Sequence, residues 1–315
     1  MAPESAKHVY GPVPSRRLGL SLGVDIVPLK TCSLNCIYCQ LGRTTALTVD
    51  RRAYTPVEAV TADVATALHE RPTPDFITIS GSGEPTLHSR LGELIDRIRT
   101  VTHLPVAIIT NGSLLWLAEV RADCAKADVV LPSLDAGDQD TFARVNRPHP
   151  EVTFTRVVSG LKAFRREYDG QIWLEVFLVR GVNDTEEAVR AIARVVADVK
   201  PDRVQLNTAV RPTAEAGLEP VSAERLAELA GLFEPPGEVI ADYHRPHVAA
   251  RESGRVEEIL EMLTRRPATV EDLASGLGLR REDVTRWVME LKRAGRIGTE
   301  VRSGKRYYFP SPGAR

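Results

Sequence analysis

The sequence predicts an α/β fold, a partial (β/α)6 barrel of the TIM type followed by a C-terminal winged helix-turn-helix domain. Three observations predict it. Strand-like and helix-like segments alternate through the first two-thirds of the 315 residues. Glycines and polar residues gather where the strand-like segments end, and the pattern changes from residue 254 onward. Alternation of this kind is typical of parallel strands joined by outer helices.

Six short apolar segments rich in β-branched residues are expected to be the strands: residues 23–28, 76–80, 106–110, 129–131, 172–179 and 203–207. Apolar residues recur at helical spacing in the segments between them: residues 58–68, 91–98, 153–164 and 186–199. Six such repeats within about 210 residues suit a barrel or a partial barrel. A doubly wound open sheet is the structural alternative.

Polar and glycine-rich motifs follow the ends of these expected strands. Five strands are followed in turn by motifs that begin at Cys32, Gly81, Thr110, Ser133 and Arg180, and the sixth strand ends at Asn207. In βα barrels, the loops at the carboxyl ends of the strands build the active site. We therefore expect one face of the barrel to collect these residues.

The C-terminal segment is expected to form three helices and a hairpin. Helical patterns cover residues 256–263 and 281–294, and Thr269 with acidic residues in the next turn is typical of a helix start. Residues 297–301 and 306–309 predict the two strands of a hairpin. This order of elements is typical of a winged helix-turn-helix.

Charge gives only a mild indication of partners. The whole chain has a formal net charge of −1, with 43% hydrophobic and 26% charged residues, as in an ordinary globular protein. Residues 254–315 carry thirteen Lys/Arg and nine Asp/Glu, a net charge of +4. Docking of nucleic acid, docking of a peptide or protein, and a scaffold role all stay open for this segment. We expect domains at residues 1–245 and 246–315.

Apolar runs and cysteine placement indicate the compartment. The longest apolar runs are strand-sized, and residues 1–8 lack the apolar core of a signal peptide. We therefore expect a cytoplasmic protein with no membrane contact. In a reducing compartment, four cysteines are metal ligands or catalysts more often than disulfides. Cys124 stands alone in an expected helix, where a cysteine is typically a small buried hydrophobe.

The other three cysteines, Cys32, Cys36 and Cys39, have the spacing C-x3-C-x2-C. Three thiolates can bind one metal centre. Structural zinc needs four protein ligands, and no local cysteine or histidine follows Cys39, although His88 is a distant candidate. A four-iron cluster held by three cysteines leaves one iron open to a small chelating molecule. The cysteine spacing alone therefore leaves two interpretations open: a binding module stabilised by zinc, or an enzyme with a catalytic iron–sulfur cluster.

The run Cys32-Ser-Leu-Asn-Cys36-Ile-Tyr-Cys39 resembles the motif of the radical S-adenosylmethionine (radical SAM) superfamily. Ser80-Gly-Ser-Gly-Glu-Pro85 resembles the glycine-rich stretch of that family. Arg180-Gly-Val-Asn-Asp184 resembles the fifth-strand end of the enzyme that starts molybdenum-cofactor synthesis. Residues 10–19 and 40–43 resemble the tRNA wyosine-base synthases. The resemblance covers roughly residues 24–211.

The resemblance implies cofactors and a role for each motif. Cys32, Cys36 and Cys39 would bind a [4Fe–4S] cluster, whose open iron would bind SAM. SAM would be cleaved to a 5′-deoxyadenosyl radical that takes hydrogen from an unidentified substrate, and a flavodoxin or ferredoxin would supply the electron. The resemblance also implies further contacts to SAM. Ile37 and Tyr38 would form an apolar shelf near the adenine, and the loop Gly81, Ser82, Gly83 with Glu84 would lie at the amino group. Ser133 and Asp135 would bond the carboxylate or ribose hydroxyls, Arg180 would pair with the carboxylate, and Asn111 and Asn207 are weaker candidates.

Other readings stay open beside this one. A tRNA base-modifying enzyme of the wyosine type is the first, although four cysteines cannot supply a second cluster with three protein thiolates. An iron–sulfur regulator that binds DNA and senses redox state is the second. The substrate is not specified, and RNA or a peptide docked by the winged helix are both candidates. Arg16 and Arg17 beside the barrel mouth suit either a solvated turn or an anion contact.

Overall fold

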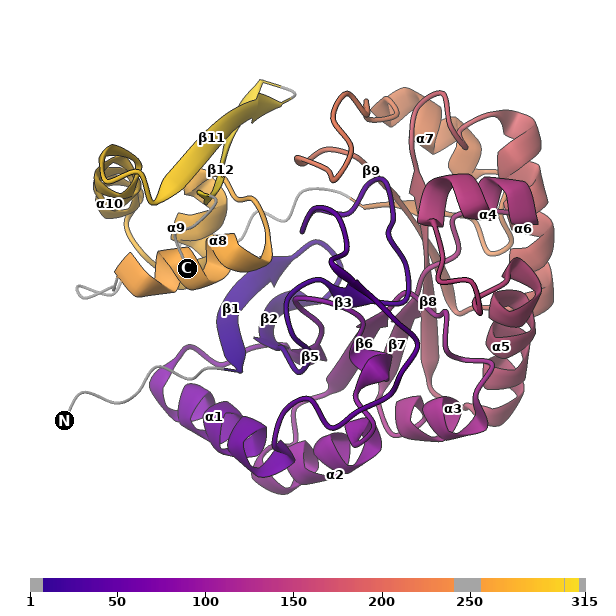
Figure 1. The fold of residues 1–315 in the computed structure, drawn as a ribbon, viewed down its shortest axis with the longest axis horizontal. Coiled ribbons are helices and arrows are strands. Elements are labelled where there is room, and N and C mark those ends of the chain that lie inside the picture. Colours follow the sequence, from indigo (N-terminus) through magenta and orange to yellow (C-terminus); the bar gives the residue numbers. More distant parts are fainter. Residues whose placement is uncertain (1–7, 241–255, 303, 312–315) are drawn as a thin grey trace.

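The computed structural model describes residues 8–240, 256–302 and 304–311 (Figure 1). Its main sheet has eight strands in the order β1-β2-β5-β6-β7-β8-β9-β10. Strand β1 runs antiparallel to β2, and the other neighbouring pairs are parallel. The strands are β1 (Val9–Ser15), β2 (Gly19–Val24), β5 (Phe76–Ile79), β6 (Val106–Thr110), β7 (Val129–Pro132), β8 (Gln171–Leu178), β9 (Arg203–Thr208) and β10 (Glu238–Val239).

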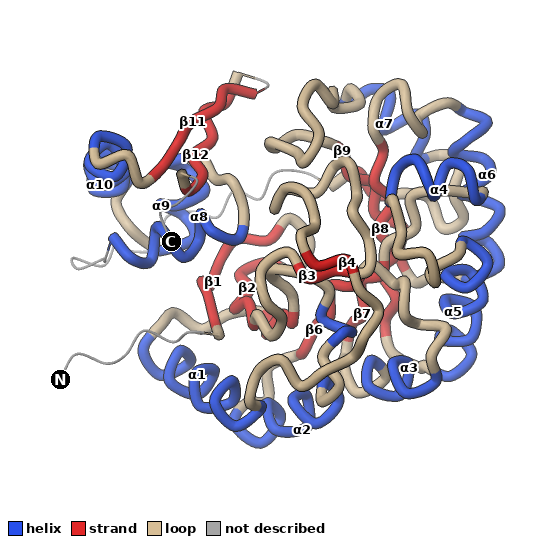
Figure 2. The backbone as a smooth tube through the Cα atoms, in the orientation of Figure 1, coloured by secondary structure: helices blue, strands red, loops and turns tan. Residues whose placement is uncertain are grey.

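Helices lie along the outside of this curved sheet, as Figure 2 shows. A separate two-stranded ladder, β3 (Thr31–Cys32) with β4 (Ala46–Leu47), lies over the strand ends. The helices of this part are α1 (Val57–Glu70), the 3-10 turn η1 (Pro85–Leu87), α2 (Leu91–Val101), α3 (Ala118–Cys124), α4 (Gln139–Asn146), α5 (Phe154–Glu167), α6 (Glu186–Val199) and α7 (Ala223–Ala230).

The strand order decides between the two predicted architectures. From β5 to β9, each strand pairs with the next strand along the chain. A doubly wound sheet reverses its order at a switch point, and this sheet has no such reversal. Within the described residues, β1 and β10 are the two edges of the sheet and do not pair with each other, so the sheet is open. The sheet is mostly parallel and its strand order is consistent with the expected partial barrel, whereas it does not fit the doubly wound alternative.

The sequence explains why these segments adopt their structures. Strands β6 and β7 are nearly continuous apolar runs, since both of their faces are covered: Ile108 and Val130 are fully buried. Helix α6 is amphipathic and buries one stripe that includes Ile192 and Val196. The side chain of Thr185 caps this helix by accepting the Ala188 N–H.

The strand β1 is an element that the sequence analysis does not predict. The sequence analysis assigns no element to residues 9–15, but Val9 pairs with Val24 and Ser15 with Gly19 across an antiparallel ladder with an irregular register. Val13 on this strand packs into the apolar core of the C-terminal part. Strand β1 therefore joins the barrel to the rest of the chain.

The C-terminal part has the expected order of three helices and a hairpin. Thr269 and Asp272 form a reciprocal capping box at the start of the second helix. The C-terminal part has an apolar core of its own, which contains Leu263, Leu273 and Val288. The predicted domain boundary at 245/246 lies outside the described residues. The elements are α8 (Val256–Arg265), α9 (Val270–Leu277), α10 (Arg281–Arg293), β11 (Ile297–Arg302) and β12 (Lys305–Pro310).

Candidate active site

A cavity of about 380 Å³ opens at the carboxyl ends of the parallel strands. Its walls come from the cysteine loop, the loop after β5, the strand ends, and the end of α8. This is the face of a βα barrel where active sites lie, and the volume is in the range of small-molecule pockets. Eleven of the residues expected at the site line it: Cys32, Cys36, Tyr38, Cys39, Gly81, Ser82, Gly83, Glu84, Asn111, Ser133 and Asn207.

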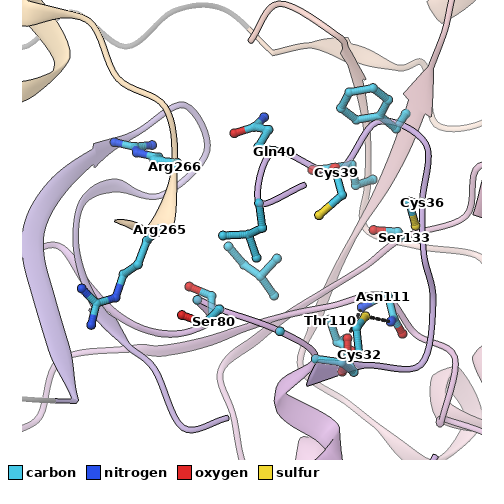
Figure 3. A pocket seen from close by; sticks show the side chains of 18 of the residues that line it. Cys32, Cys36, Cys39, Gln40, Ser80, Thr110, Asn111, Ser133, Arg265 and Arg266 are labelled. Carbon is cyan, nitrogen blue, oxygen red and sulfur yellow. Dashed lines mark hydrogen bonds between the residues drawn. The ribbon is translucent and has the colours of Figure 1, made fainter. Parts of the chain in front are cut away.

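Three cysteine side chains face this cavity from the short strand β3 and the loop that follows it. Figure 3 shows Cys32, Cys36 and Cys39 on the same side of the cavity. Two amide side chains approach the sulfur atoms. Nδ2 of Asn111 lies 3.4 Å from Sγ of Cys32, and Nδ2 of Asn146 lies 3.4 Å from Sγ of Cys36. These donors can stabilise sulfur in its thiolate form.

Burial raises the pKa of all three thiols. For Cys32, burial and then the nearby carboxylate of Glu84 raise the pKa to about 12, and the carboxylate of Asp135 adds to the effect of burial at Cys36. Because a metal binds the thiolate, loading this site displaces protons that the thiols otherwise keep at neutral pH.

In the described part of the chain, no group of three or more His, Cys, Asp or Glu side chains is arranged to hold a single metal ion. Structural zinc needs four protein ligands, and His88, the distant candidate for the fourth, does not line the cavity. A four-iron cluster spreads its ligands over several irons. Three thiols line one cavity, and Cys124 is buried in α3 outside its wall, which fits a [4Fe–4S] cluster with one open iron.

An aromatic pair forms part of the wall beside the cysteines. The ring of Tyr38 stacks on that of Phe177, with centroids 3.9 Å apart and planes 9° from parallel. Its hydroxyl donates to Oδ2 of Asp135 at 2.5 Å. Asp135 also accepts from Nδ2 of Asn146 at 2.7 Å and from the N–H of Phe177 at 2.9 Å. Burial raises the pKa of Asp135 to about 6.

The glycine loop after β5 packs against the strand that carries the first cysteine. Gly81 has φ +146, and a Cβ at Gly83 would lie 2.0 Å from the carbonyl oxygen of Thr31. Ser82 donates its hydroxyl to Asp25, and its carbonyl accepts from the N–H of Lys30 at 2.6 Å. Small residues are therefore required here because the two loops touch through their backbones.

Glu84 lies at the end of this loop and is almost fully buried. It accepts from Oγ1 of Thr110 at 2.6 Å, from the N–H of Asn111 at 2.7 Å, and from both the N–H and Oγ1 of Thr86. Burial raises its pKa, and these donors oppose the shift. The carboxylate thus ties the end of β5 to the end of β6, in addition to lining the cavity.

Three expected site residues do not line the cavity. Arg180 is exposed and pairs with Glu219 at 2.8 Å, because the turn after β8 directs it outward. The structure therefore gives no support to its expected role at the SAM carboxylate. Asp135 turns to Tyr38 and Asn146, which engages both of its oxygens. Ile37 is buried behind the loop, where its backbone bonds to Val145.

The cavity also has a basic wall that the sequence analysis identifies only in part. Arg16 and Arg17, which were candidates for an anion contact, both line it. Arg211 from the segment after β9, and Arg265 and Arg266 at the end of α8, join them. Arg265 and Arg266 are adjacent in the sequence, more than twenty residues after the last strand of the main sheet. The residues around them give no sign that they line a cavity at the strand ends of that sheet.

Comparison with known proteins gives one family. The sequence matches the radical SAM superfamily over residues 26–193. It is 35% identical over 278 residues to a UPF0026 protein of Helicobacter pylori, covering 86% of this chain and 88% of that protein. It is 40% identical over 303 residues to a protein of Brachyspira hyodysenteriae named GTPase Obg, covering 95% of this chain. The chain spans only 44% of that protein, whose activity is therefore not transferred.

A crystal structure of a radical SAM methyltransferase from Sphaerobacter thermophilus has the same type of fold. The TM-score is 0.51 at 21% sequence identity, over 70% of this chain and 65% of that chain. At that identity the likeness concerns the fold alone. None of the helices in the described residues is both long and apolar enough to cross a membrane.

Proposed function

This chain belongs to the radical SAM superfamily, and from that premise we propose that Cys32, Cys36 and Cys39 hold its cluster in an enzyme that takes a hydrogen atom from a substrate. The chain is an enzyme whose cofactors are those of the superfamily, a [4Fe–4S] cluster and SAM. When bound, the reduced cluster supplies the electron that cleaves SAM to a 5′-deoxyadenosyl radical.

The observation that carries this proposal is the arrangement of the thiols. Three cysteines line one side of a cavity at the strand ends, while Cys124 is buried in a helix outside its wall. With three thiolates, the protein leaves one coordination position for SAM. The amides of Asn111 and Asn146, each 3.4 Å from a sulfur atom, would donate to the thiolates and hold them in place.

The residues around the thiols fit a nucleoside with an amino-acid end. The loop from Gly81 to Gly83 lines the cavity near the cysteines, and Ser133 and Asn207 line it with polar side chains. The stacked Tyr38 supplies an aromatic surface. We assign these residues to SAM binding, with Asp135 as the residue that fixes the position of Tyr38.

An external one-electron reductant is needed, as in radical SAM enzymes generally, and we propose a flavodoxin or a ferredoxin. We further propose that the C-terminal helices and hairpin are a winged helix that contributes to substrate binding. The wyosine-type reaction gains no support, because the four cysteines of the chain cannot supply a second three-cysteine cluster. A redox-sensing regulator would not need the set of strand-end residues that line the cavity.

The test replaces each cysteine by alanine in anaerobically prepared protein. Cys32→Ala, Cys36→Ala and Cys39→Ala should each lose the iron content and the formation of 5′-deoxyadenosine from SAM. The matched control is Cys124→Ala, which should keep both. Equal loss in the control, or SAM cleavage that persists in the three variants, would overturn the assignment.

A further inference from the structure

The C-terminal part reaches the mouth of the barrel with the side chain of Arg265, at the end of α8. Figure 1 shows α8 beside β1, and Val13 of β1 packs into the apolar core of the C-terminal part. From this junction Arg265 extends into the wall of the cavity, and its side chain is 13% exposed. Figure 3 shows it across the cavity from Cys32, Cys36 and Cys39. The end of α8 is thus part of the candidate active site.

The carboxylate of Asp25 lies between Arg265 and the glycine loop after β5. Nε of Arg265 lies 3.3 Å from Oδ2 of Asp25. The backbone N–H of Ser82 donates to Oδ1 of the same carboxylate at 3.1 Å, and the Ser82 hydroxyl donates to Oδ2. The Asp25 side chain is only 9% exposed, so protein donors, more than water, stabilise its charge.

A second contact joins Arg265 to the same segment through Tyr10. The guanidinium lies over the Tyr10 ring, 4.6 Å from its centroid. The Tyr10 hydroxyl is hydrogen-bonded to Oγ of Ser80 at 3.0 Å. The ring packs closely on β2, because a Cβ at Gly23 would lie 2.1 Å from its Cζ atom. The two residues that contact Arg265 from the barrel therefore each hold one residue of the segment 80–82.

The glycine loop has little room to move independently of Asp25. A Cβ at Gly81 would lie 2.5 Å from Cγ of Asp25, so the loop backbone passes directly over this carboxylate. On its other side, the loop is bonded to the segment that carries the first cysteine, because the carbonyl of Ser82 accepts from the N–H of Lys30 at 2.6 Å. In a close-packed interior, a shift of Asp25 is passed on to the loop that lines the cavity.

The contacts of Arg265 fix it against the barrel. Its Nε bonds to Asp25, and its Nη1 donates to the carbonyl oxygen of Glu261 at 3.0 Å, one turn earlier in α8. The guanidinium also lies over the Tyr10 ring. This arrangement favours a role in holding neighbouring protein groups over a direct contact with a ligand.

We propose that Asp25 and Arg265 are positioning residues for SAM, and that their contact holds the glycine loop (residues 81–83) in the conformation that binds SAM. The C-terminal part thereby sets the SAM affinity of the barrel. The inference rests on the proposed function in one respect, that this loop binds SAM. Loss of one partner leaves the other charge buried without its counterion, which is strongly unfavourable. The Asp25 carboxylate then moves or finds other donors, and the loop moves with it.

The first measurement is amide hydrogen exchange in the iron-free full chain, read by mass spectrometry on peptides that contain residues 80–85. Arg265→Gln and Asp25→Asn should each raise the exchange rate in this segment by about fivefold or more, the lower end of couplings between distant sites. A thermal melt of each variant shows that it is folded.

The matched control is Arg302→Gln, which should leave this exchange unchanged. Arg302 also reaches from the C-terminal part to the barrel, but it does so after β9. Its Nη1 lies 3.3 Å from Oγ1 of Thr213, and its Nη2 donates to the carbonyl of Leu218. An equal effect of this variant would mean that docking of the C-terminal part as a whole holds the loop, and it would overturn the assignment to Arg265 and Asp25.

The second measurement is 5′-deoxyadenosine formation by the reconstituted proteins at varied SAM concentration. Arg265→Gln and Asp25→Asn should each raise the KM for SAM by about fivefold or more and change kcat much less. A general loss of structure would reduce the amount of active protein, and with it kcat, without moving KM. The double variant should have no higher a KM than the weaker-binding single variant, because both changes remove the same contact.

The outcomes separate this inference from the proposed function. Unchanged exchange in folded Arg265→Gln would overturn the contact as a support of the loop. Faster exchange with an unchanged KM for SAM, or effects that multiply in the double variant, would overturn the positioning role. Absence of SAM cleavage in the wild type would instead refute the proposed function, and the exchange measurement would still confirm or refute the support of the loop by Arg265.

Discussion

Asp135 lies at the centre of the contacts that hold the aromatic wall of the cavity, and its removal is the sharpest test of that wall. Its carboxylate accepts three hydrogen bonds, from the Tyr38 hydroxyl at 2.5 Å, from Nδ2 of Asn146 at 2.7 Å and from the N–H of Phe177 at 2.9 Å. Asp135→Ala removes the acceptor of all three donors at once. Asp135→Asn keeps the shape and one acceptor oxygen.

The magnitude follows from these contacts. A buried donor left without a partner costs about 1–3 kcal/mol, so three donors put the gross loss at roughly 3–9 kcal/mol. Burial outweighs these donors and raises the Asp135 pKa from 3.8 to about 6, so the ionised carboxylate is itself unfavourable in the folded chain at pH 7, which brings the net loss toward the low end of that range. We therefore expect Asp135→Ala to lose about 3 kcal/mol of unfolding free energy. Asp135→Asn should lose less, because the unpartnered Oδ1 of Asn146 can accept from the new amide.

Urea unfolding of the iron-free chain, followed by tryptophan fluorescence, measures both variants. The folded pKa of Asp135 is raised, so the unfolded chain gives up this proton first, and the wild type loses stability relative to Asp135→Asn as the pH rises from about 4 to 6. The control is Asp138→Ala, which loses only the cap of α4 and should cost about 1 kcal/mol. A loss below about 1 kcal/mol for Asp135→Ala, or equal losses for both Asp135 variants, would refute the reasoning.

Three further predictions follow from the packing. Gly83→Ala places a Cβ 2.0 Å from the carbonyl oxygen of Thr31 and should lower the melting temperature by several degrees, whereas Gly231→Ala, whose nearest neighbour is 3.5 Å away, should not. Thr269→Ala removes the capping box of α9 and should cost about 1 kcal/mol in urea unfolding, and an unchanged midpoint would contradict the cap. A chain that ends at residue 251 should still form 5′-deoxyadenosine slowly, because the three cysteines and the glycine loop that line the cavity all precede that point; loss of SAM cleavage in a folded truncated chain would contradict this.

The barrel itself could be predicted because its signals are local. The apolar runs of β6 and β7 are continuous, and helices such as α6 show one apolar stripe, so each element is visible within its own segment. The rule that parallel strands end on one face then places the cysteines, the glycine loop and Asn111 together without any knowledge of tertiary contacts. Eleven of the expected site residues do line one cavity for this reason.

Side-chain direction and long-range pairing could not be predicted from the sequence. Arg180 and Asp135 both follow strand ends, but the turn after β8 sends Arg180 to Glu219, and the backbone after β7 turns Asp135 toward Tyr38. Sequence position gives the face of the barrel, not the direction of each side chain. Strand β1 was missed because Gly11 and its neighbouring prolines are typical of turns; its ladder with β2 and its contact with the C-terminal core at Val13 are both tertiary.

The two sides of the cavity differ in charge, and this difference orients what enters it. On one side, the thiols lie beside Glu84, whose charge opposes thiolate formation until a metal is bound. On the other side, Arg211 and Arg266 line the wall, and Arg211 pairs with Asp272 at 3.7 Å. Arg266 directly follows α8, so the C-terminal part contributes a basic side chain to the same cavity as the cysteines. A difference in charge of this kind would favour a substrate that enters with its more negative end toward the arginines.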